Sequence, residues 1–141
     1  MNYFCDKYEG LKLQAYKCPA GVWTIGGGIT VYPDGNPVKE GDIITKEYAE
    51  AIQNDYFIRH VDPIIMGMKK KFTSRQKEAL ESLIFNIGGS AFKKSSLYTA
   101  IVNDDIKGIF KNWDWIGAGG KVLKGLAKRR AEELSWFLGD M

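Results

Sequence analysis

The spacing of apolar residues changes near Thr45, and this change constrains the fold more than any other feature of the chain. Before it, Leu11 and Leu13 alternate with polar residues, as in a strand with one buried face. After it, Tyr48 and Ile52 lie four residues apart, as on one face of a helix. The sequence therefore predicts an α+β fold, in which a small N-terminal β-sheet is followed by a mainly helical lobe.

Turn-forming residues divide the N-terminal part. Residues 1–9 are expected to form a short helix that ends at Gly10, where a left-handed cap is common. A turn from Cys18 to Gly21 separates two strand-like runs, and a second turn cluster covers residues 32–37. We expect a β-containing lobe over about residues 10–44.

The remainder of the chain has helical periodicity. A helix over about residues 45–62 is expected to connect the two lobes and to end near Pro63. Thr73 to Gln76 matches a capping box, and the apolar residues from Ala79 to Ile87 that follow it predict the best core helix. Three more helices are expected, through Ile101, around 106–113 and over 123–138.

The length favours one domain. A chain of 141 residues is the size of a single core, with 1–9 and 63–141 expected to form the helical lobe. The composition, 45% hydrophobic and 26% charged, is that of an ordinary globular protein. A cleft between the two lobes would be the natural place for a ligand.

Charge and cysteine content argue against several classes of function. The net charge of +3 and the absence of a nucleic-acid-binding motif argue against a nucleic-acid binder, and Lys128-Arg129-Arg130 is expected to be a solvated face. Two cysteines and the lone His60 do not have zinc-ligand spacing, so neither a metal site nor a cofactor is expected. No apolar run is long enough to span a membrane, and the N-terminus does not resemble a signal peptide. We expect synthesis in a cytoplasm and no stable membrane insertion.

Glu9 and Cys18 are the candidates for chemistry. A helix end followed by a hairpin can bring both side chains to one cleft. A carboxyl group that acts as a general acid needs a raised pKa, and apolar neighbours such as Tyr8 and Trp23 could supply it. Taken alone, Glu9 would more often be a surface carboxylate and Cys18 a free buried thiol.

The string E-G-L-K-L-x-A-Y-x-x-x-x-G-x-x-T-I-G-x-G, from Glu9 to Gly28, changes that balance. It resembles the N-terminal signature of phage-type lysozymes (endolysins) of glycoside hydrolase family 24. Downstream blocks extend the resemblance over nearly the full chain. They are the segments 43–47, 76–80, 85–88 and 119–126, with Arg129 and Arg130.

The resemblance implies a role for particular residues. Glu9 takes the place of the family's catalytic acid and Thr24 that of its threonine, which helps to place a water molecule. Cys18 stands where the family has an aspartate. As a thiolate it could attack the anomeric carbon or stabilise charge there, provided that Lys17 or another cation lowers its pKa. The resemblance also places three residues on the saccharide-facing side: Thr30, Phe85 and Ser95.

Two further departures from the family lie in the glycine-rich loop. Gly27 replaces an aromatic or aliphatic residue, and Ile29 replaces a histidine. The glycines could serve tight turning, close approach of a sugar, or both. Phe85 could equally be a core residue, and Ser95 a helix cap.

The function implied is that of a muramidase that hydrolyses the β-1,4 bond between N-acetylmuramic acid and N-acetylglucosamine in bacterial peptidoglycan. A lytic transglycosylase and a catalytically inactive wall-binding module are the alternatives. We expect a monomer without cofactor or metal, which is made in the host bacterial cytoplasm and acts on the cell wall after a separate holin allows its release.

Overall fold

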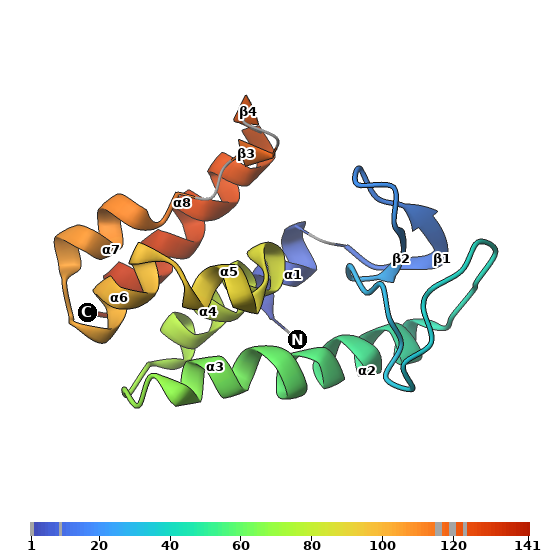
Figure 1. Cartoon of the computed structure of the whole chain (residues 1–141), viewed down its shortest axis with the longest axis horizontal. Coiled ribbons are helices and arrows are strands. Elements are labelled where there is room, and N and C mark those ends of the chain that lie inside the picture. Colours follow the sequence, from blue (N-terminus) through green and yellow to red (C-terminus); the bar gives the residue numbers. More distant parts are fainter. Residues whose placement is uncertain (1, 9, 115–116, 119–120, 123) are drawn as a thin grey trace. The chain divides into compact units, whose positions relative to one another are not determined.

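The computed structural model describes residues 2–8, 10–114, 117–118, 121–122 and 124–141 (Figure 1). The chain divides into two compact units, Met1–Arg59 and His60–Met141. The first unit contains a small antiparallel sheet, and the second is mainly helical. This architecture confirms the predicted α+β class.

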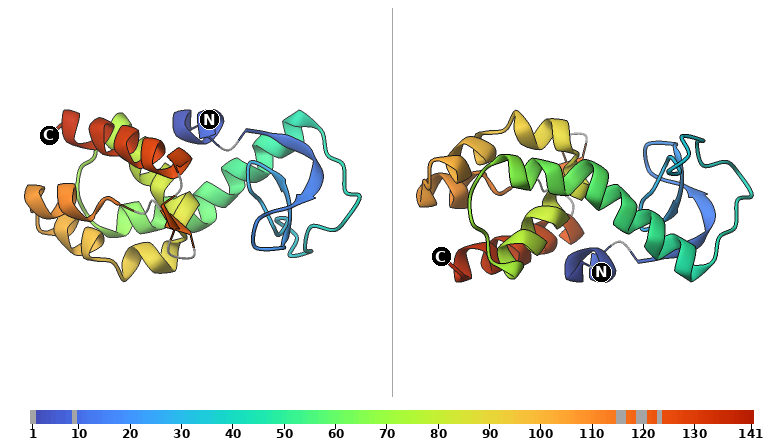
Figure 2. Two further views of the ribbon diagram at one scale, coloured as in Figure 1. Left: turned by 90° about the horizontal axis from the view of Figure 1, so that it is seen from above. Right: turned by 90° about the horizontal axis from the view of Figure 1, so that it is seen from below.

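A short helix and a hairpin begin the first unit. Helix α1 covers Tyr3–Tyr8, and Gly10 follows in the left-handed conformation, with φ of +67°, as the sequence predicts. Strand β1 (Lys12–Lys17) pairs antiparallel with β2 (Trp23–Gly26). Both views of Figure 2 show this hairpin beside the first turns of α2 (Lys46–Tyr56), and α2 contacts both strands.

The helical stretch after residue 45 differs from the single helix predicted over 45–62. Thr45 caps α2 as expected, since its side chain accepts a hydrogen bond from the backbone N–H of Tyr48. A π-helical segment then covers Phe57–Val61, and α3 follows over Asp62–Gly67. Pro63 thus lies in the first turn of a helix instead of ending one, where its missing N–H costs no hydrogen bond.

The second unit is built around the predicted core helix. Helix α4 begins after the capping box of Thr73 and Gln76, in which each side chain accepts a hydrogen bond from the other residue's backbone N–H. Helices α4 and α8 pack together, as do α6 and α7. Besides α3, the helices that the structure describes in this unit are α4 (Ser74–Ile87), α5 (Gly89–Lys93), α6 (Ser96–Val102), α7 (Ile106–Asn112) and α8 (Lys124–Gly139).

The buried face of α4 agrees with its predicted periodicity, whereas a second small sheet does not follow from the sequence. Leu80, Leu83 and Ile84 of α4 are fully buried, together with Phe137 of α8. Two-residue strands β3 (Gly117–Ala118) and β4 (Lys121–Val122) pair antiparallel in the segment where the sequence predicts only a break between helices. Strands this short carry no periodicity from which they could be predicted.

Candidate functional site

The turn between β1 and β2 holds Cys18 in a defined position. Its backbone N–H donates to the carbonyl of Val22 at 3.0 Å, and its carbonyl accepts from the N–H of Gly21 at 2.8 Å. Gly21 has φ of +81°, a conformation that a side chain would strain. The thiol of Cys18 is partly exposed. The hairpin therefore presents the thiol at its tip instead of burying it.

Thr24 lies next to that tip on β2. Its backbone pairs with Tyr16 across the hairpin, and its side chain is 4% exposed. The Thr24 hydroxyl donates to the carbonyl of Val22 at 2.9 Å and is also within hydrogen-bonding reach of the Cys18 thiol. A hydroxyl has one proton and two lone pairs, so Thr24 can donate to Val22 or to a thiolate but not to both at full strength.

Hydrogen bonds lower the pKa of the Cys18 thiol. The backbone N–H of Val22 makes the largest contribution, followed by that of Ala20, while partial desolvation acts in the opposite direction. The Thr24 hydroxyl adds a smaller lowering of the pKa. Donors aimed at the sulfur favour its charged form. The source of the shift differs from the lysine predicted from the sequence, since the Lys17 ammonium lies over the Trp23 ring, 5.5 Å from its centroid.

The predicted acid, Glu9, lies outside the described residues. Its neighbours are described: Tyr8 ends α1, and Gly10 precedes the strand that leads to Cys18. The described chain thus brings Cys18 and Thr24 together, and the position of the Glu9 carboxylate stays a prediction.

Of the three predicted saccharide-facing residues, Thr30 lies in the first unit and Phe85 and Ser95 lie in the second. Thr30 is an exposed residue of the first unit, where its carbonyl accepts from the N–H of Val38 at 2.9 Å. Phe85 lies near the end of α4 and is partly buried. Ser95 caps α6 by accepting from the N–H of Tyr98. The cap confirms a structural role for Ser95, and a role in sugar binding stays a prediction for all three.

The glycine-rich loop is a tight turn packed against α2. Gly26 and Gly28 have φ of +66° and +113°, and Ile29 is buried in the position where the resemblance implies a histidine. A Cβ atom on Gly27 would lie 2.3 Å from Nε2 of Gln53, a residue that is only 2% exposed. The loop has no side chain at Gly27 because the Gln53 amide occupies that space.

A buried charged cluster in the second unit contradicts the expectation of a solvated basic face. Arg129 and Arg130 are 3% and 1% exposed. Their Nε atoms lie 3.3 and 2.7 Å from the carboxylate of Glu133, which is itself fully buried. Ser82 and the indole N–H of Trp113 also donate to this carboxylate. Sequence alone could not reveal the cluster, because its members come from three separate segments.

Burial and charge act on Glu133 in opposite directions. Burial raises the pKa of its carboxyl group, and the two guanidinium groups with the hydrogen bonds from Ser82 and Trp113 oppose that shift. Arg129 also donates to the hydroxyl and the carbonyl of Ser82, at 3.1 and 3.3 Å. The cluster ties α4 to α8, and Trp113, which is also buried, joins it from the residue after α7.

The described part of the chain offers neither a metal-binding cluster nor a membrane-spanning helix. Its side chains contain no group of three or more His, Cys, Asp and Glu residues that could hold a metal ion. None of its helices is both long enough and apolar enough to cross a membrane.

Comparison with known proteins extends the resemblance. The family model described as phage lysozyme matches residues 6–133. The chain is 38% identical over 136 residues to an endolysin of Acyrthosiphon pisum secondary endosymbiont phage 1, covering 93% of this chain and 90% of the relative. It is 35% identical over 139 residues to an endolysin of Bacillus phage PZA, covering 92% of this chain and 50% of that longer protein.

A solved structure with a similar fold is also that of an endolysin. The solved structure of an endolysin from Escherichia coli O157:H7 phage FAHEc1 superposes with a TM-score of 0.78 at 30% identity. The match covers 97% of this chain and 89% of the other.

Proposed function

Because this chain belongs to the phage lysozyme family, we propose that it is an endolysin-type lysozyme that hydrolyses the β-1,4 bond between N-acetylmuramic acid and N-acetylglucosamine in bacterial peptidoglycan. The family match over residues 6–133, which includes the whole Glu9–Cys18–Thr24 region, is the observation that carries the proposal. The named endolysin relatives support action on the cell wall.

The proposed chemistry begins with proton transfer from Glu9. Its neutral carboxyl group donates a proton to the bridging oxygen, the C1–O bond breaks, and the leaving sugar departs as an alcohol. Positive charge develops on the ring that keeps C1. A water molecule supplies the oxygen that binds C1, and its second proton returns to the enzyme, so the overall reaction adds one water.

Cys18 is proposed to act at C1 as a thiolate, either as the nucleophile or by stabilising the developing charge. Its lowered pKa supports this role, since a larger fraction of the sulfur is ionised near neutral pH than in a free thiol. Thr24, buried beside it, is proposed to hold the attacking water or to donate to the sulfur.

Substitution of the acid tests the proposal. Glu9→Gln should lower the release of fragments from purified peptidoglycan by about 100- to 10,000-fold, the usual contribution of a general acid, while its unfolding transition stays that of the parent. Full activity in this variant would refute the assignment of Glu9. The products of the parent should carry one added water per bond cleaved. Anhydro products lacking that water would indicate a transglycosylase, and binding without fragments would indicate an inactive wall-binding module.

Cys18 is tested separately. Cys18→Asp should retain or raise activity, because it restores a carboxylate, whereas Cys18→Ser should lose most activity, because a hydroxyl does not ionise near neutral pH. Activity in Cys18→Ala equal to that of the parent would show that the sulfur has no part in the reaction. The anomeric configuration of the first product distinguishes a covalent intermediate from direct attack by water.

The remaining parts of the proposal follow from the family and not from particular contacts. The enzyme is proposed to act as a monomer on the wall after synthesis in the bacterial cytoplasm, with a separate holin providing its release.

A further inference from the structure

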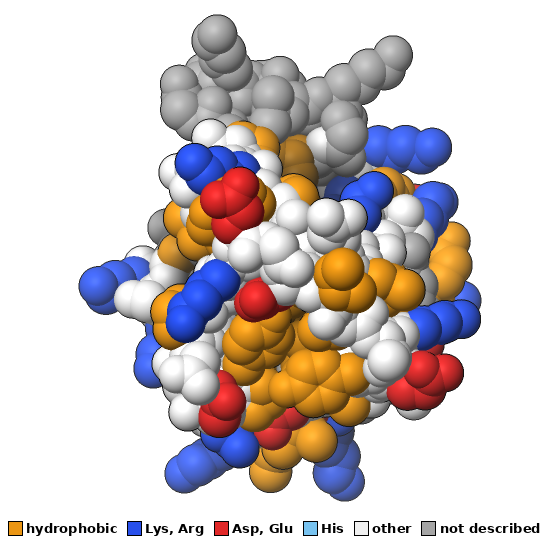
Figure 3. Space-filling view, turned by 90° about the vertical axis from the view of Figure 1, so that its right-hand side faces the viewer, with side chains coloured by type: hydrophobic (Ala, Val, Ile, Leu, Met, Phe, Trp, Pro, Cys, Tyr) orange, Lys and Arg blue, Asp and Glu red, His pale blue; other side chains and the backbone are white. Residues whose placement is uncertain are grey.

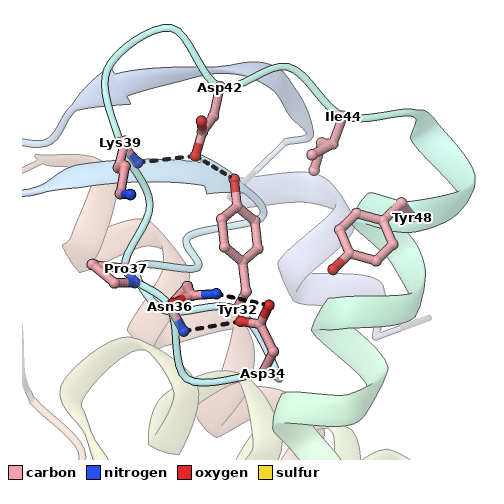
Figure 4. A pocket seen from close by; sticks show the side chains of 8 residues that line it. All are labelled: Tyr32, Asp34, Asn36, Pro37, Lys39, Asp42, Ile44 and Tyr48. Atoms are coloured by element: carbon pink, nitrogen blue, oxygen red, sulfur yellow. Dashed lines mark hydrogen bonds between the residues drawn. The ribbon is translucent and has the colours of Figure 1, made fainter.

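An open groove of about 400 Å³ lies on the first unit, apart from the residues assigned above to catalysis. It lies between the loop that follows Thr30 and the first turn of α2 (Figure 4). Two tyrosines and two aspartates face it from these elements, with Tyr32 in the middle of the view and Tyr48 across from it on α2. We call it the tyrosine groove.

One end of the groove is held by Asp42. Its Oδ2 atom accepts from the Tyr32 hydroxyl at 2.8 Å and from the backbone N–H of Lys39 at 3.0 Å. Desolvation, followed by the hydrogen bond and the charge of Asp42, raises the pKa of Tyr32 to about 12. Tyr32 is therefore a neutral, oriented side chain at physiological pH. Among the described residues, Oδ1 of Asp42 has no hydrogen-bond partner.

The opposite end is a closed turn. Asp34 accepts from the backbone N–H and the side-chain amide of Asn36, at 2.9 and 3.0 Å. The N–H of Tyr32 donates to the carbonyl of Asn36, and Gly35, with φ of +92°, donates to the carbonyl of Tyr32. These bonds order the loop without a ligand, so binding would cost little conformational entropy there.

The wall of the groove is aromatic and open to solvent. The rings of Tyr32 and Tyr48 lie 6.4 Å apart at an interplanar angle of 34°, and Tyr48 is 44% exposed. Ile44 lies beside Tyr48 on the same wall (Figure 4). Figure 3 shows the side of the molecule that carries the hairpin in Figure 1, where hydrophobic side chains gather with acidic and basic ones at their edge. A groove that combines two aromatic rings with several polar groups offers a ligand both apolar and hydrogen-bonding contacts.

We propose that the tyrosine groove binds a sugar ring of the glycan strand as a second contact outside the catalytic residues, an inference that rests on the proposed function. A pyranose has an apolar C–H face that can stack on Tyr48 and a rim of hydroxyl groups that both donate and accept. Oδ1 of Asp42 can accept from such a hydroxyl, and the Lys39 ammonium and the Tyr48 hydroxyl can donate to one.

The charges at the rim favour a neutral ligand over an ionic one. The two aspartate carboxylates oppose binding of an anion such as a phosphate. Lys39 offsets part of their charge, and Asp34 already accepts two hydrogen bonds from its own turn, so a cation gains little there. A neutral sugar ring neither repels the aspartate carboxylates nor competes with Lys39 for them.

The position of the groove in the chain suits a polymer. Val31 pairs with Pro37 in an isolated β-bridge, and the N–H of Val38 donates to the carbonyl of Thr30. The groove is thus built on the same loop as Thr30, a predicted saccharide-facing residue. A glycan strand that contacts Thr30 would therefore reach the loop that carries the groove.

The test is a nitrogen-15 NMR titration of the Glu9→Gln variant with the β-1,4-linked tetramer of N-acetylglucosamine, a soluble glycan of the same linkage. The amide signals of Asn36, Lys39 and Asp42 should shift along one saturable curve. Adding Tyr48→Ala should raise the dissociation constant from that curve about tenfold, the effect of losing roughly 1.4 kcal/mol of stacking. Tyr48→Phe keeps the ring, so its dissociation constant should stay within about threefold of that of the Glu9→Gln parent.

Phe110→Ala is the matched control, because Phe110 is an aromatic residue of α7 that is 66% exposed and does not line the groove. It should leave the curve unchanged. Absence of shifts at the three groove amides, or an equal loss in Phe110→Ala and Tyr48→Ala, would overturn the proposal. So would shifts with trilysine and none with the sugar, since the ligand class would then be a cationic peptide.

Failure of the groove and failure of the enzyme are distinguishable. Release of fragments by the unmodified chain, with no groove shifts in the titration, would reject the groove and leave the hydrolase. Groove shifts without any fragment release would reject the hydrolase and leave a glycan-binding surface.

Discussion

Replacing Gly27 with alanine should destabilise the protein by about 1–3 kcal/mol, because the new methyl group would overpack the turn after β2. Its Cβ would lie 2.3 Å from Nε2 and 3.0 Å from Cδ of Gln53. Real contacts of this kind are near 3.5–4.0 Å, so one group must move by about an ångström. The Gln53 side chain has little freedom to do so, since it is 2% exposed.

A second substitution isolates the contact. The Nε2 atom of Gln53 is buried without a hydrogen-bond partner in the described structure, so removing this side chain loses packing but no hydrogen bond from that atom. In a Gln53→Ala background the alanine at Gly27 has space, and its cost should fall below about 0.5 kcal/mol. The coupling free energy between the two sites should therefore be about 0.5 kcal/mol or more.

Urea denaturation followed by circular dichroism measures the free energy of unfolding of all four proteins in this cycle. Gly67→Ala is the matched control: Gly67 ends α3, has no atom within 4 Å of an added Cβ, and should gain up to about 1 kcal/mol from the substitution. Equal costs of Gly27→Ala in both backgrounds, or no cost in either, would refute the proposed packing of Gln53 against the loop.

Three further predictions concern ionisable groups. Glu133→Gln should lower the free energy of unfolding, measured in urea, by about 3–5 kcal/mol, because it leaves two buried guanidinium groups without their carboxylate. A loss below about 1 kcal/mol would contradict the buried pairing of Glu133 with the two arginines. The pKa of Tyr32 is about 12 in the folded state against an ordinary 10, so Tyr32 contributes stability that is present below pH 10 and is lost between pH 10 and 12. Tyr32→Phe should remove a phenol titration near pH 12 seen at 295 nm, and an unchanged curve would argue against the Asp42 bond. If the Cys18 thiolate is the active form, lysis is present above the lowered pKa of the thiol and is lost as pH falls through that pKa. Cys18→Asp should move this loss of activity to lower pH. If the parent and the variant lose activity at the same pH, another group titrates.

Features that depend on neighbouring residues could be predicted from the sequence. The capping box at Thr73, the cap at Thr45, the left-handed Gly10 and the turn at Cys18 each follow from a few adjacent residues, and all are present in the structure. The buried face of α4 follows from its periodicity in the same way. These are local preferences of the backbone, which hold wherever the segment is placed.

Resemblance to a family identified candidate site residues that composition alone could not. It singled out Cys18 and Thr24, which the hairpin brings together, and it named Glu9, whose position lies outside the described residues. The cause of the lowered pKa of Cys18 could not be predicted from the sequence. Lys17 lies over Trp23, and the hydrogen bonds from the backbone N–H groups of Val22 and Ala20 exist only once the turn has folded.

The amino-acid sequence by itself determined the capped starts of α2 and α4, the main turns, the α+β order of the chain and its family. Only the tertiary structure decided that Arg129 and Arg130 are buried around Glu133, that Gln53 excludes a side chain at Gly27, and that Tyr32 and Tyr48 form one groove. Arginine in a basic run is solvated by default. Only a carboxylate supplied by the same packing can offset the large cost of burying its charge, and no local pattern records which residues that packing brings together.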